Sequence, residues 1–358
     1  MATPQEICTV TANGQKYDIW ETVEVSRVYP VVMDHAMLTV SEISTAGGAG
    51  FSNLKLAPGD EAEITLGGVV AITGSVYLRQ AAYDSTTHAV QIGIASQVEA
   101  IVRTTVDGVP GQYLNQNLQQ IASACFGKVG VKFSIRGAPE GADLVFPRIS
   151  ETIGQSRFAF VEQLCRLRNL HMIDDGKGGV AAFRGPQGDA APLQEGVNIL
   201  KARVMLKVSE SSVNIKGVSQ FYHQGSQGAG TTAKGTTPLP FQPHPPGNLD
   251  FIAPNAADKP SLQMNVNHVV DANAYSSVDG LVTVQGWFVA SGDLWMNYVG
   301  SSVTVNSPML VPSGSMKFMI RGVIHRQSSA EGSTTDILIT NQNGLGNSER
   351  VEGANPTP

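Results

Sequence analysis

Hydrophobic and polar positions alternate in short runs along the first 105 residues, which is the pattern of half-buried β-strands. The dipeptide Asn13-Gly14 separates two such runs and predicts a two-residue hairpin turn. Strand candidates recur about every 8–15 residues with turn residues between them, which favours a barrel or sandwich. They are Ile7–Val10, Tyr17–Trp20, Val23–Tyr29, Ala36–Ile43, Glu61–Leu66, Val69–Leu78 and Ala89–Ile94.

The pattern changes after Thr105. Apolar residues in Tyr113–Phe126 recur on one helical face, and Gly127 is placed to end that helix. Ser156 can cap a second helix, Arg157–Arg168. With the short strands Val131–Ile135, Leu144–Phe146, Leu170–Ile173 and Gly179–Phe183, these helices predict a compact α/β module. The turn Asp174-Asp175-Gly176-Lys177-Gly178 joins the last two strands into a hairpin.

From about residue 190 the chain returns to strand-like alternation. The candidates are Ile199–Val208, Ser212–Tyr222, Gly280–Ala290, Ser302–Asn306, Met316–His325 and Thr334–Thr340. Between them, Gly225 to Pro260 is dense in glycine, threonine and proline, which predicts an extended insertion with no regular strand ladder. The last stretch, from Asn341 to Pro358, is polar and rich in glycine and proline, which predicts a loose tail.

These patterns predict a mainly β protein with an α/β module, in which two β-barrel domains flank a helix–strand domain. The expected domains are an N-terminal β-barrel (1–105), the α/β module (106–186), a C-terminal β-barrel (187–222 and 261–340), the insertion (223–260) and the tail (341–358).

Composition adds one unusual feature, which is a scarcity of charge. Charged residues make up 15% of the chain, against roughly 25% in ordinary soluble domains. The 24 Lys and Arg and the 30 Asp and Glu give a net charge of −6, so specific nucleic-acid binding through phosphates is not expected. No apolar run is long enough to span a membrane, and the N-terminus lacks the pattern of a secretory signal.

The three cysteines, Cys8, Cys125 and Cys165, are odd in number and widely spaced. They match neither a disulfide framework nor a zinc site. We expect buried free thiols in a protein made in the cytoplasm.

A search for catalytic motifs finds none of the usual signatures, so no catalytic residue, cofactor or metal is expected. The cluster Gly47-Gly48-Ala49-Gly50 lacks the residues of a phosphate cradle and is interpreted as a flexible loop. His171 with Asp174 and Asp175 could form a metal or general-base cluster, but the aspartates lie where a hairpin turn is predicted. Glu61 and Glu63 are interpreted as solvated strand charges rather than a glycosidase pair.

Aromatic residues bracket the turn Gly292-Asp293 in the C-terminal part of the chain. Trp287, Trp295 and Tyr298 are candidate interface residues, because large aromatic side chains are enriched at interfaces. Packing in the core is the alternative.

The order of these elements resembles that of a known family. The step Gly154-Gln155-Ser156 precedes a helix whose residues Phe158, Phe160, Leu164, Arg166 and Arg168 match the family pattern, although Gln155 replaces the usual acidic residue. Further matching segments are Gly74–Leu78, Tyr83-Asp84, His88–Gly93, Ser96–Arg103, the hairpin Leu170–Arg184, and the C-terminal series Trp295, Val303–Leu310, Phe318–His325 and Thr334–Thr340. Over roughly residues 15–340, the chain is similar to the baseplate hub proteins of contractile phage tails, the late-control or Mu-like hub family.

The resemblance implies a structural virion protein of the tail baseplate and no enzymatic activity. Such a hub is a homotrimer whose two tail-tube-like domains per subunit form a ring that adapts the hexameric tail tube to the trimeric central spike protein. The implied partners are further copies of the chain, the spike protein, the tail tube protein and baseplate wedge proteins, with no membrane partner. Few surface charges fit a protein that buries large faces against neighbours.

Two alternatives remain open. One is a virion-associated β protein that binds or degrades carbohydrate, which would need paired carboxylates or an aromatic sugar platform. The other is the hub of a phage-tail-like injection device, which the residues do not separate from a phage hub.

Overall fold

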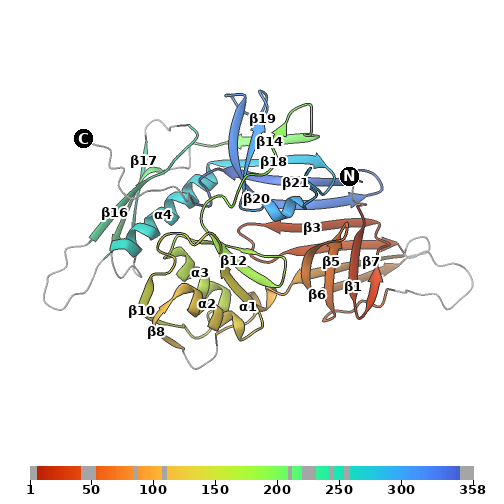
Figure 1. Cartoon of the computed structure of the whole chain (residues 1–358), viewed down its shortest axis with the longest axis horizontal. Helices are drawn as coiled ribbons and strands as arrows, with labels where there is room; N and C mark the ends of the chain where they lie inside the picture. The colour runs from red at the N-terminus through yellow and green to blue at the C-terminus, as the bar shows by residue number, and fades with distance from the viewer. Residues whose placement is uncertain are drawn as a thin grey trace, which may run out of the picture.

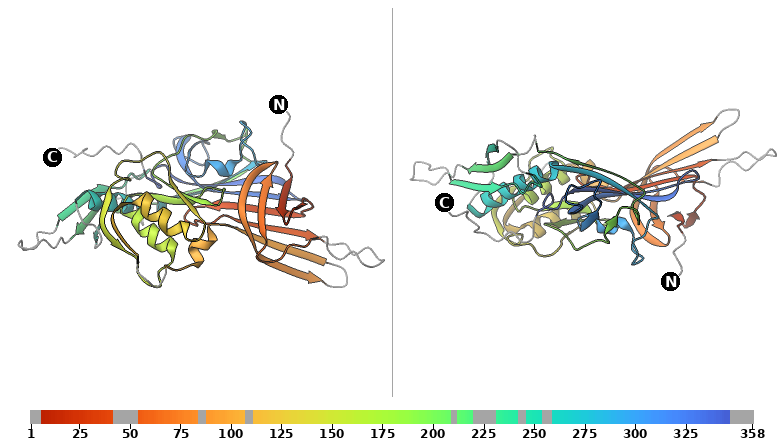
Figure 2. Two further views of the ribbon diagram at one scale, coloured as in Figure 1. Left: turned by 60° about the horizontal axis from the view of Figure 1, so that its bottom comes forward. Right: turned by 90° about the horizontal axis from the view of Figure 1, so that it is seen from above.

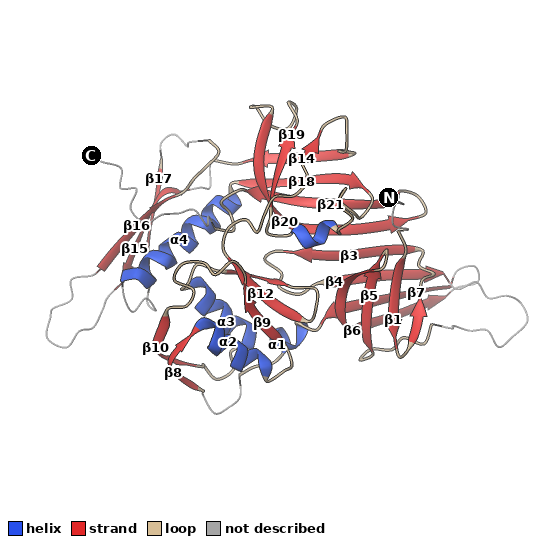
Figure 3. Cartoon of the chain, in the orientation of Figure 1, coloured by secondary structure: helices blue, strands red, loops and turns tan. Residues whose placement is uncertain are grey.

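The computed structural model describes residues 6–41, 54–83, 88–106, 111–208, 212–219, 231–241, 246–253 and 259–346. It confirms the predicted class, which is a mainly β chain with a small α/β module (Figures 1 and 3). The predicted glycine loop at Gly47-Gly48-Ala49-Gly50 and most of the predicted tail lie outside the described residues.

A single 13-stranded sheet runs through both β-rich parts of the chain, in the order β14-β18-β21-β20-β3-β4-β7-β6-β5-β1-β2, with β19 beside β20 and β13 beside β19. The N-terminal strands are β1 (Cys8–Ala12), β2 (Gln15–Tyr17), β3 (Thr22–Val28), β4 (His35–Ser41), β5 (Glu61–Leu66), β6 (Val69–Tyr83) and β7 (His88–Ser96). The C-terminal strands are β13 (Leu193–Gln194), β14 (Lys201–Leu206), β18 (Val278–Gln285), β19 (Ser302–Asn306), β20 (Ser315–Ser328) and β21 (Gly332–Asn341). The short helix η1 (Trp295–Tyr298) lies between β18 and β19.

The two parts meet at β3 and β20, which pair antiparallel from Gly322 opposite Val28 to Ser328 opposite Thr22. A single cluster of buried apolar residues lies behind this join and draws on both parts, including Ile64 and Ile72 from one and Ile337 and Ile339 from the other. The alternation of buried and exposed residues predicted from the sequence is observed along β5. The Asn13-Gly14 hairpin is confirmed, because both residues adopt the positive φ angles, 52° and 73°, of a type I′ turn.

The α/β module consists of α1 (Glu99–Arg103), β8 (Gln112–Asn117), α2 (Leu118–Gly127), β9 (Lys132–Ile135), β10 (Val145–Ser150), α3 (Arg157–Arg166), β11 (His171–Asp174) and β12 (Gly179–Phe183). It has an apolar core of its own, which includes Cys125 and Cys165 as buried free thiols, as predicted. The Ser156 cap is also confirmed, because its side chain accepts a hydrogen bond from the Ala159 N–H.

One predicted boundary in the module is wrong. The helix expected over Tyr113–Phe126 begins only at Leu118, and the residues before it form β8, paired with β10. The physical reason is a capping box: Asn117 Oδ1 accepts from the Gln120 N–H while Gln120 Oε1 accepts from the Asn117 N–H. This exchange fixes the helix start, and strand pairing satisfies the backbone that precedes it.

A separate three-stranded sheet corrects the prediction for the insertion. Strands β16 (Thr231–Thr236) and β17 (Gly247–Ile252) flank β15 (Ser212–Ser219), so the stretch expected to lack a ladder supplies two strands, and β15 does not join the large sheet. Neither β16 nor β17 contains proline, which explains why the proline-rich segments around them do not prevent pairing. Helix α4 (Lys259–Ser276), absent from the sequence prediction, covers this sheet.

We call β15, β16, β17 and α4 the α4 lobe. Its residues Ile215, Ala233, Leu262, Val266 and Val270 belong to a third core cluster, distinct from the other two. The lobe is inserted between β14 and β18, which are neighbours in the large sheet. Its two chain connections therefore meet at one neck, where the Lys207 N–H donates to the Ser277 carbonyl. Among the described residues, no helix combines the length and apolarity needed to span a membrane.

Candidate assembly surfaces

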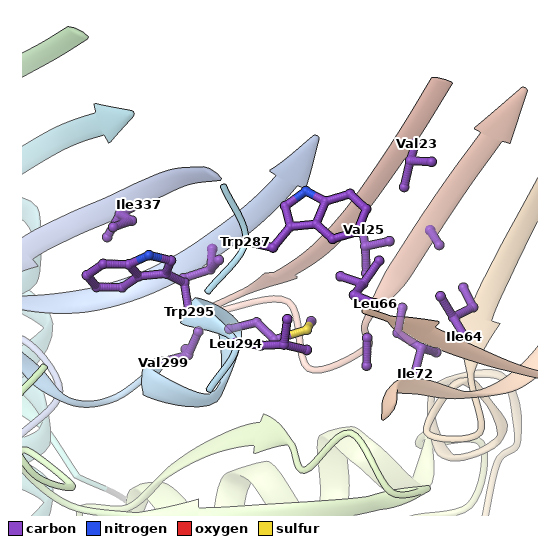
Figure 4. Close-up of a cluster of buried hydrophobic side chains, with 14 of the residues drawn as sticks. Val23, Val25, Ile64, Leu66, Ile72, Trp287, Leu294, Trp295, Val299 and Ile337 are labelled. Carbon is purple, nitrogen blue, oxygen red and sulfur yellow. The ribbon is translucent and has the colours of Figure 1, made fainter. Parts of the chain in front are cut away.

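The tryptophans proposed as interface residues lie in the core. Trp287 is 0% exposed, and its Nε1–H donates to the Arg326 carbonyl at 3.0 Å. Trp295 is 4% exposed, and Figure 4 shows both indoles among aliphatic side chains of the two parts of the sheet. The interface interpretation is therefore corrected for these two residues in favour of its alternative, core packing. Tyr298 is half-buried, with its hydroxyl 3.4 Å from Ser291 Oγ.

A buried ionic cluster fixes the module to both parts of the sheet. Arg27 on β3 donates from Nε at 2.8 Å and Nη2 at 2.6 Å to Asp34 Oδ2, and Nη1 reaches the Met296 carbonyl at 3.4 Å. The Asp34 N–H in turn donates to Asp174 Oδ2 at the end of β11. Burial raises the pKa of the Asp34 carboxyl, and Arg27 opposes that rise. One guanidinium thus holds two carboxylates from separate structural parts.

The two aspartates of the candidate cluster, Asp174 and Asp175, build a hairpin turn, as the sequence favoured, and His171 is not part of it. Asp174 Oδ1 accepts from the Gly176 N–H at 2.7 Å, and Asp175 Oδ1 accepts from the Lys177 and Gly179 N–H groups. These are Asx-type hydrogen bonds that build the turn. His171 instead faces Tyr29 and α4, and the described residues contain no group of three or more metal-type ligands.

One face of the large sheet is turned away from the core and carries two sets of ion-paired side chains. Arg326 on β20 lies between Glu24 on β3, at 3.1 Å, and Asp336 on β21. Arg321 pairs with Asp279 at 2.9 Å further along the same sheet. A polar hollow on this face is lined by residues that include Glu24, Met37, Thr39, Gln91 and Arg326. We call this face of the sheet the open face. At β14 it also carries the exposed Lys201 and Arg203.

Two strand edges at opposite ends of this face have no partner among the described residues. β14 pairs only with β18. β6 pairs with β5 as far as Ser75, and Val76 still exchanges backbone hydrogen bonds with Gly59 and Asp60, so the second half of β6, from Tyr77 to Ala82, pairs with β7 alone among the described strands. Figure 2 shows β6 and β7 projecting beyond the body, and Tyr83 at the end of the described part of β6 is 84% exposed. Unpaired edges of this kind are templates for pairing with another chain.

Exposed apolar side chains lie beside the β14 edge. β13 and β19 are parallel, so the loops that follow them leave the sheet at the same end. Val197 and Leu200 in one loop are 72% and 56% exposed, and Met309 in the other is 84% exposed. Ser307 Oγ donates to Glu195 Oε2 at 2.5 Å and ties the two loops together. The sequence pattern did not single out these residues, because isolated apolar residues in loops carry no periodic signal.

Comparison with known proteins finds no matching family model and no matching curated protein. Solved structures do match. The chain is similar to the 43 kDa tail protein of prophage MuSo2 from Shewanella oneidensis, with a TM-score of 0.80 at 19% identity, covering 95% of this chain and 99% of that one. It is similar to the tail protein from Neisseria meningitidis MC58, with a TM-score of 0.76 at 13% identity, covering 95% and 97%.

A third similar structure is the E. coli c3393 protein, a component of the type VI secretion system, with a TM-score of 0.59 at 9% identity, covering 94% of this chain and 78% of that one. The similarity to all three extends over nearly the whole of this chain and is one of fold. The chain therefore has the fold of phage tail proteins.

Proposed function

We propose that the protein is the structural hub subunit of a contractile phage tail baseplate. In this proposal three copies form a ring between the hexameric tail tube and the trimeric central spike, and wedge proteins bind outside it. The observation that carries the proposal is the open face, a run of eight strands (β14-β18-β21-β20-β3-β4-β7-β6) built from two similar-sized parts of the chain. Within the described part of the chain, β14 at one side and the second half of β6 at the other have no outer partner.

The two edges supply a mechanism for closing the ring. β14 of one copy can pair with the second half of β6 of the next, which continues the sheet around the axis and leaves no free edge. The module and strands β1 and β5 cover the other side of the sheet. The outside of a ring has a larger circumference than its inside, so this bulkier side lies outside and the open face turns toward the axis. The exposed Val197 and Leu200 lie in the loop that leads into β14, where a neighbouring copy would cover them.

The direct test is the mass of the purified protein in solution, by light scattering or native mass spectrometry. A homotrimer has three times the chain mass of 37.8 kDa, and electron microscopy should show a three-fold ring. A monomer at micromolar concentration, with and without the spike protein, would contradict the proposal.

A pair of proline variants tests the edge mechanism. The hydrogen bond from the Lys207 N–H to the Ser277 carbonyl shows which N–H groups of β14 point to β18. They belong to alternate residues, including Arg203, whereas the Ala202 N–H points outward. Ala202→Pro should therefore keep the fold and weaken trimer formation at least about tenfold. Arg203→Pro, the control, should instead destabilise the monomer itself. An Ala202→Pro variant that trimerises like the wild type contradicts edge pairing at β14.

The injection-device alternative shares this proposal's geometry. The similarity to a type VI secretion component keeps it open, since a hub of either particle needs the same ring. The identity of the particle that contains the protein, seen by immunogold labelling of phage lysates, distinguishes them.

A further inference from the structure

Helix α4 presents two different faces, and the difference points to a movable lobe. Its apolar stripe, Leu262, Val266, Val270 and Ala274, is buried, and the first three of these residues join the lobe's own core. A second stripe at helical spacing carries Ser261, Met264, His268, Asp271 and Tyr275, and these residues contact the α/β module, β3 and β20. The first stripe builds the lobe, and the second, mostly polar, docks it.

Hydrogen bonds and aromatic contacts make up most of this docking seam. Arg168 Nη1 donates to Ser261 Oγ at 3.1 Å, and Asn169 Nδ2 donates to Asp271 Oδ2 at 2.9 Å. The Tyr275 hydroxyl donates to the Tyr29 carbonyl at 3.1 Å. Water can replace contacts of these kinds when the surfaces separate, whereas separating an apolar core exposes surface with no compensation.

Two histidines stack at the centre of the seam. The imidazoles of His171 on β11 and His268 on α4 are 5.1 Å apart and inclined by 22°. His171 Nδ1 lies 3.0 Å from the Tyr29 hydroxyl, whereas His171 Nε2 and His268 Nδ1 are shielded from solvent without a hydrogen-bond partner. The two rings are therefore held together in their neutral forms.

The charged groups around the two histidines disfavour protonation of either imidazole. Arg166 on α3 lies near His268, and Arg184 after β12 lies near His171. Glu162 pairs with Arg166, and Asp271 already accepts from Asn169, while Tyr29 and Tyr275 are neutral. Burial and these arginines lower the pKa of His268 to about 4 and that of His171 well below its usual value. Protonation of either ring thus favours separation of the seam.

We propose that the α4 lobe undocks from the α/β module as one body on acidification, turning at the Lys207–Ser277 neck, with the His171–His268 pair as the switch. The lobe keeps its own core while the polar seam opens. This inference is independent of the proposed hub function, because it concerns contacts within one chain.

The size of the effect follows from the linkage between protonation and docking. The His268 pKa is about 4 when docked and 6.5 at its ordinary value. The docked form therefore loses stability as pH falls from 6.5 toward 4, and at pH 5 the undocked-to-docked ratio rises about 30-fold through His268 alone.

Distance measurement by electron spin resonance tests the proposal on the full-length protein. Spin labels on Arg148→Cys in β10 and Lys234→Cys in β16 report the separation of module and lobe, since both positions are exposed and the native cysteines described are buried. A second, longer distance should grow about 30-fold in relative population between pH 7.5 and 5.0. His268→Phe, which keeps an aromatic ring without a titrating group, should show a smaller acid-induced growth of the longer distance, because only His171 still titrates in the seam. His35→Asn, a histidine outside the seam, should behave as the wild type.

An unchanged distance distribution in the wild type overturns the proposal. An acid-induced longer distance that grows as much in His268→Phe as in the wild type overturns the role of this histidine. If that variant fails to fold, hydrogen exchange of His325→Gln, in which β20 carries no buried histidine, decides. Protection corrected for intrinsic rates should fall at pH 5.0 on the docking stripe of α4 and on β11, while β18, β20 and β21 keep theirs. Equal loss on all of these elements would overturn the proposal.

Discussion

The join between β3 and β20 and the seam between α4 and the module are both long-range contacts, but they are built in opposite ways. The first combines seven register pairs, a shared apolar core and the buried Arg27 cluster. The second depends on side-chain hydrogen bonds and two stacked imidazoles. Backbone ladders over an apolar core bind two parts permanently, whereas a polar seam between units with separate cores can open without unfolding either.

The largest effect is expected for Arg27→Ala. It leaves Asp34 and Asp174 buried beside each other without their cation, which should lower the free energy of unfolding by about 3–5 kcal/mol. Chemical denaturation measures this loss. Arg103→Ala removes an exposed pair with Glu99 and serves as the control, with a change below about 1 kcal/mol. Similar losses for both variants would show that the buried cluster does not strengthen the join.

Gly176→Ala tests the same cluster from the module side. Gly176 has a φ of 75°, and a Cβ there would lie 2.4 Å from Arg27 Nη2. Left-handed strain plus this overlap should cost about 2–4 kcal/mol. Gly14→Ala provides the matched control, because Gly14 has nearly the same φ, 73°, with open space around it, and should cost only about 1–2 kcal/mol. Equal losses would mean that Arg27 moves aside freely.

Acid should affect the two regions differently through two histidines. His325 is fully buried on β20, and burial lowers its pKa to about 3. A lowered histidine pKa means that the unfolded chain binds the proton first, so stability falls as pH drops below 6.5. His325 should thereby cost the large sheet about 2 kcal/mol at pH 5. Global denaturation at pH 7.5 and 5.0 should show this loss in the wild type and less of it in His325→Gln. An equally large loss in His325→Gln would show that this histidine does not make the large sheet sensitive to acid.

The smallest effect is expected for Tyr275→Phe, which removes the two hydrogen bonds of this hydroxyl, a donated bond to the Tyr29 carbonyl and a long accepted bond from Arg321 Nη1. It should weaken docking by about 1 kcal/mol, roughly fivefold in the docking equilibrium, with no change in the large sheet. Hydrogen exchange on α4 compared with β21 measures both. Tyr298→Phe is the control, because its hydroxyl makes only an exposed 3.4 Å contact and should change neither. Faster exchange on β21 would show that the lobe supports the sheet.

The amino-acid sequence by itself determined the local elements of this protein. Asn13-Gly14, Ser156 and Asp174-Asp175-Gly176 specify a turn, a helix cap and a hairpin through their own backbone preferences and side-chain hydrogen bonds. Strand alternation and the apolar helix faces gave the mainly β class and the α/β module, because these patterns depend only on neighbours within a few residues.

The tertiary structure alone decided how those elements join. It buried Trp287 and Trp295, made strands of β16 and β17, and gave α4 a second stripe that a single apolar periodicity does not reveal. It also brought Arg27, Asp34 and Asp174 together and, among the described residues, left β14 and the second half of β6 each with one open edge. The reason is physical: burial, ion pairing and a free strand edge are properties of segments distant in sequence, and they arise only when the chain has packed.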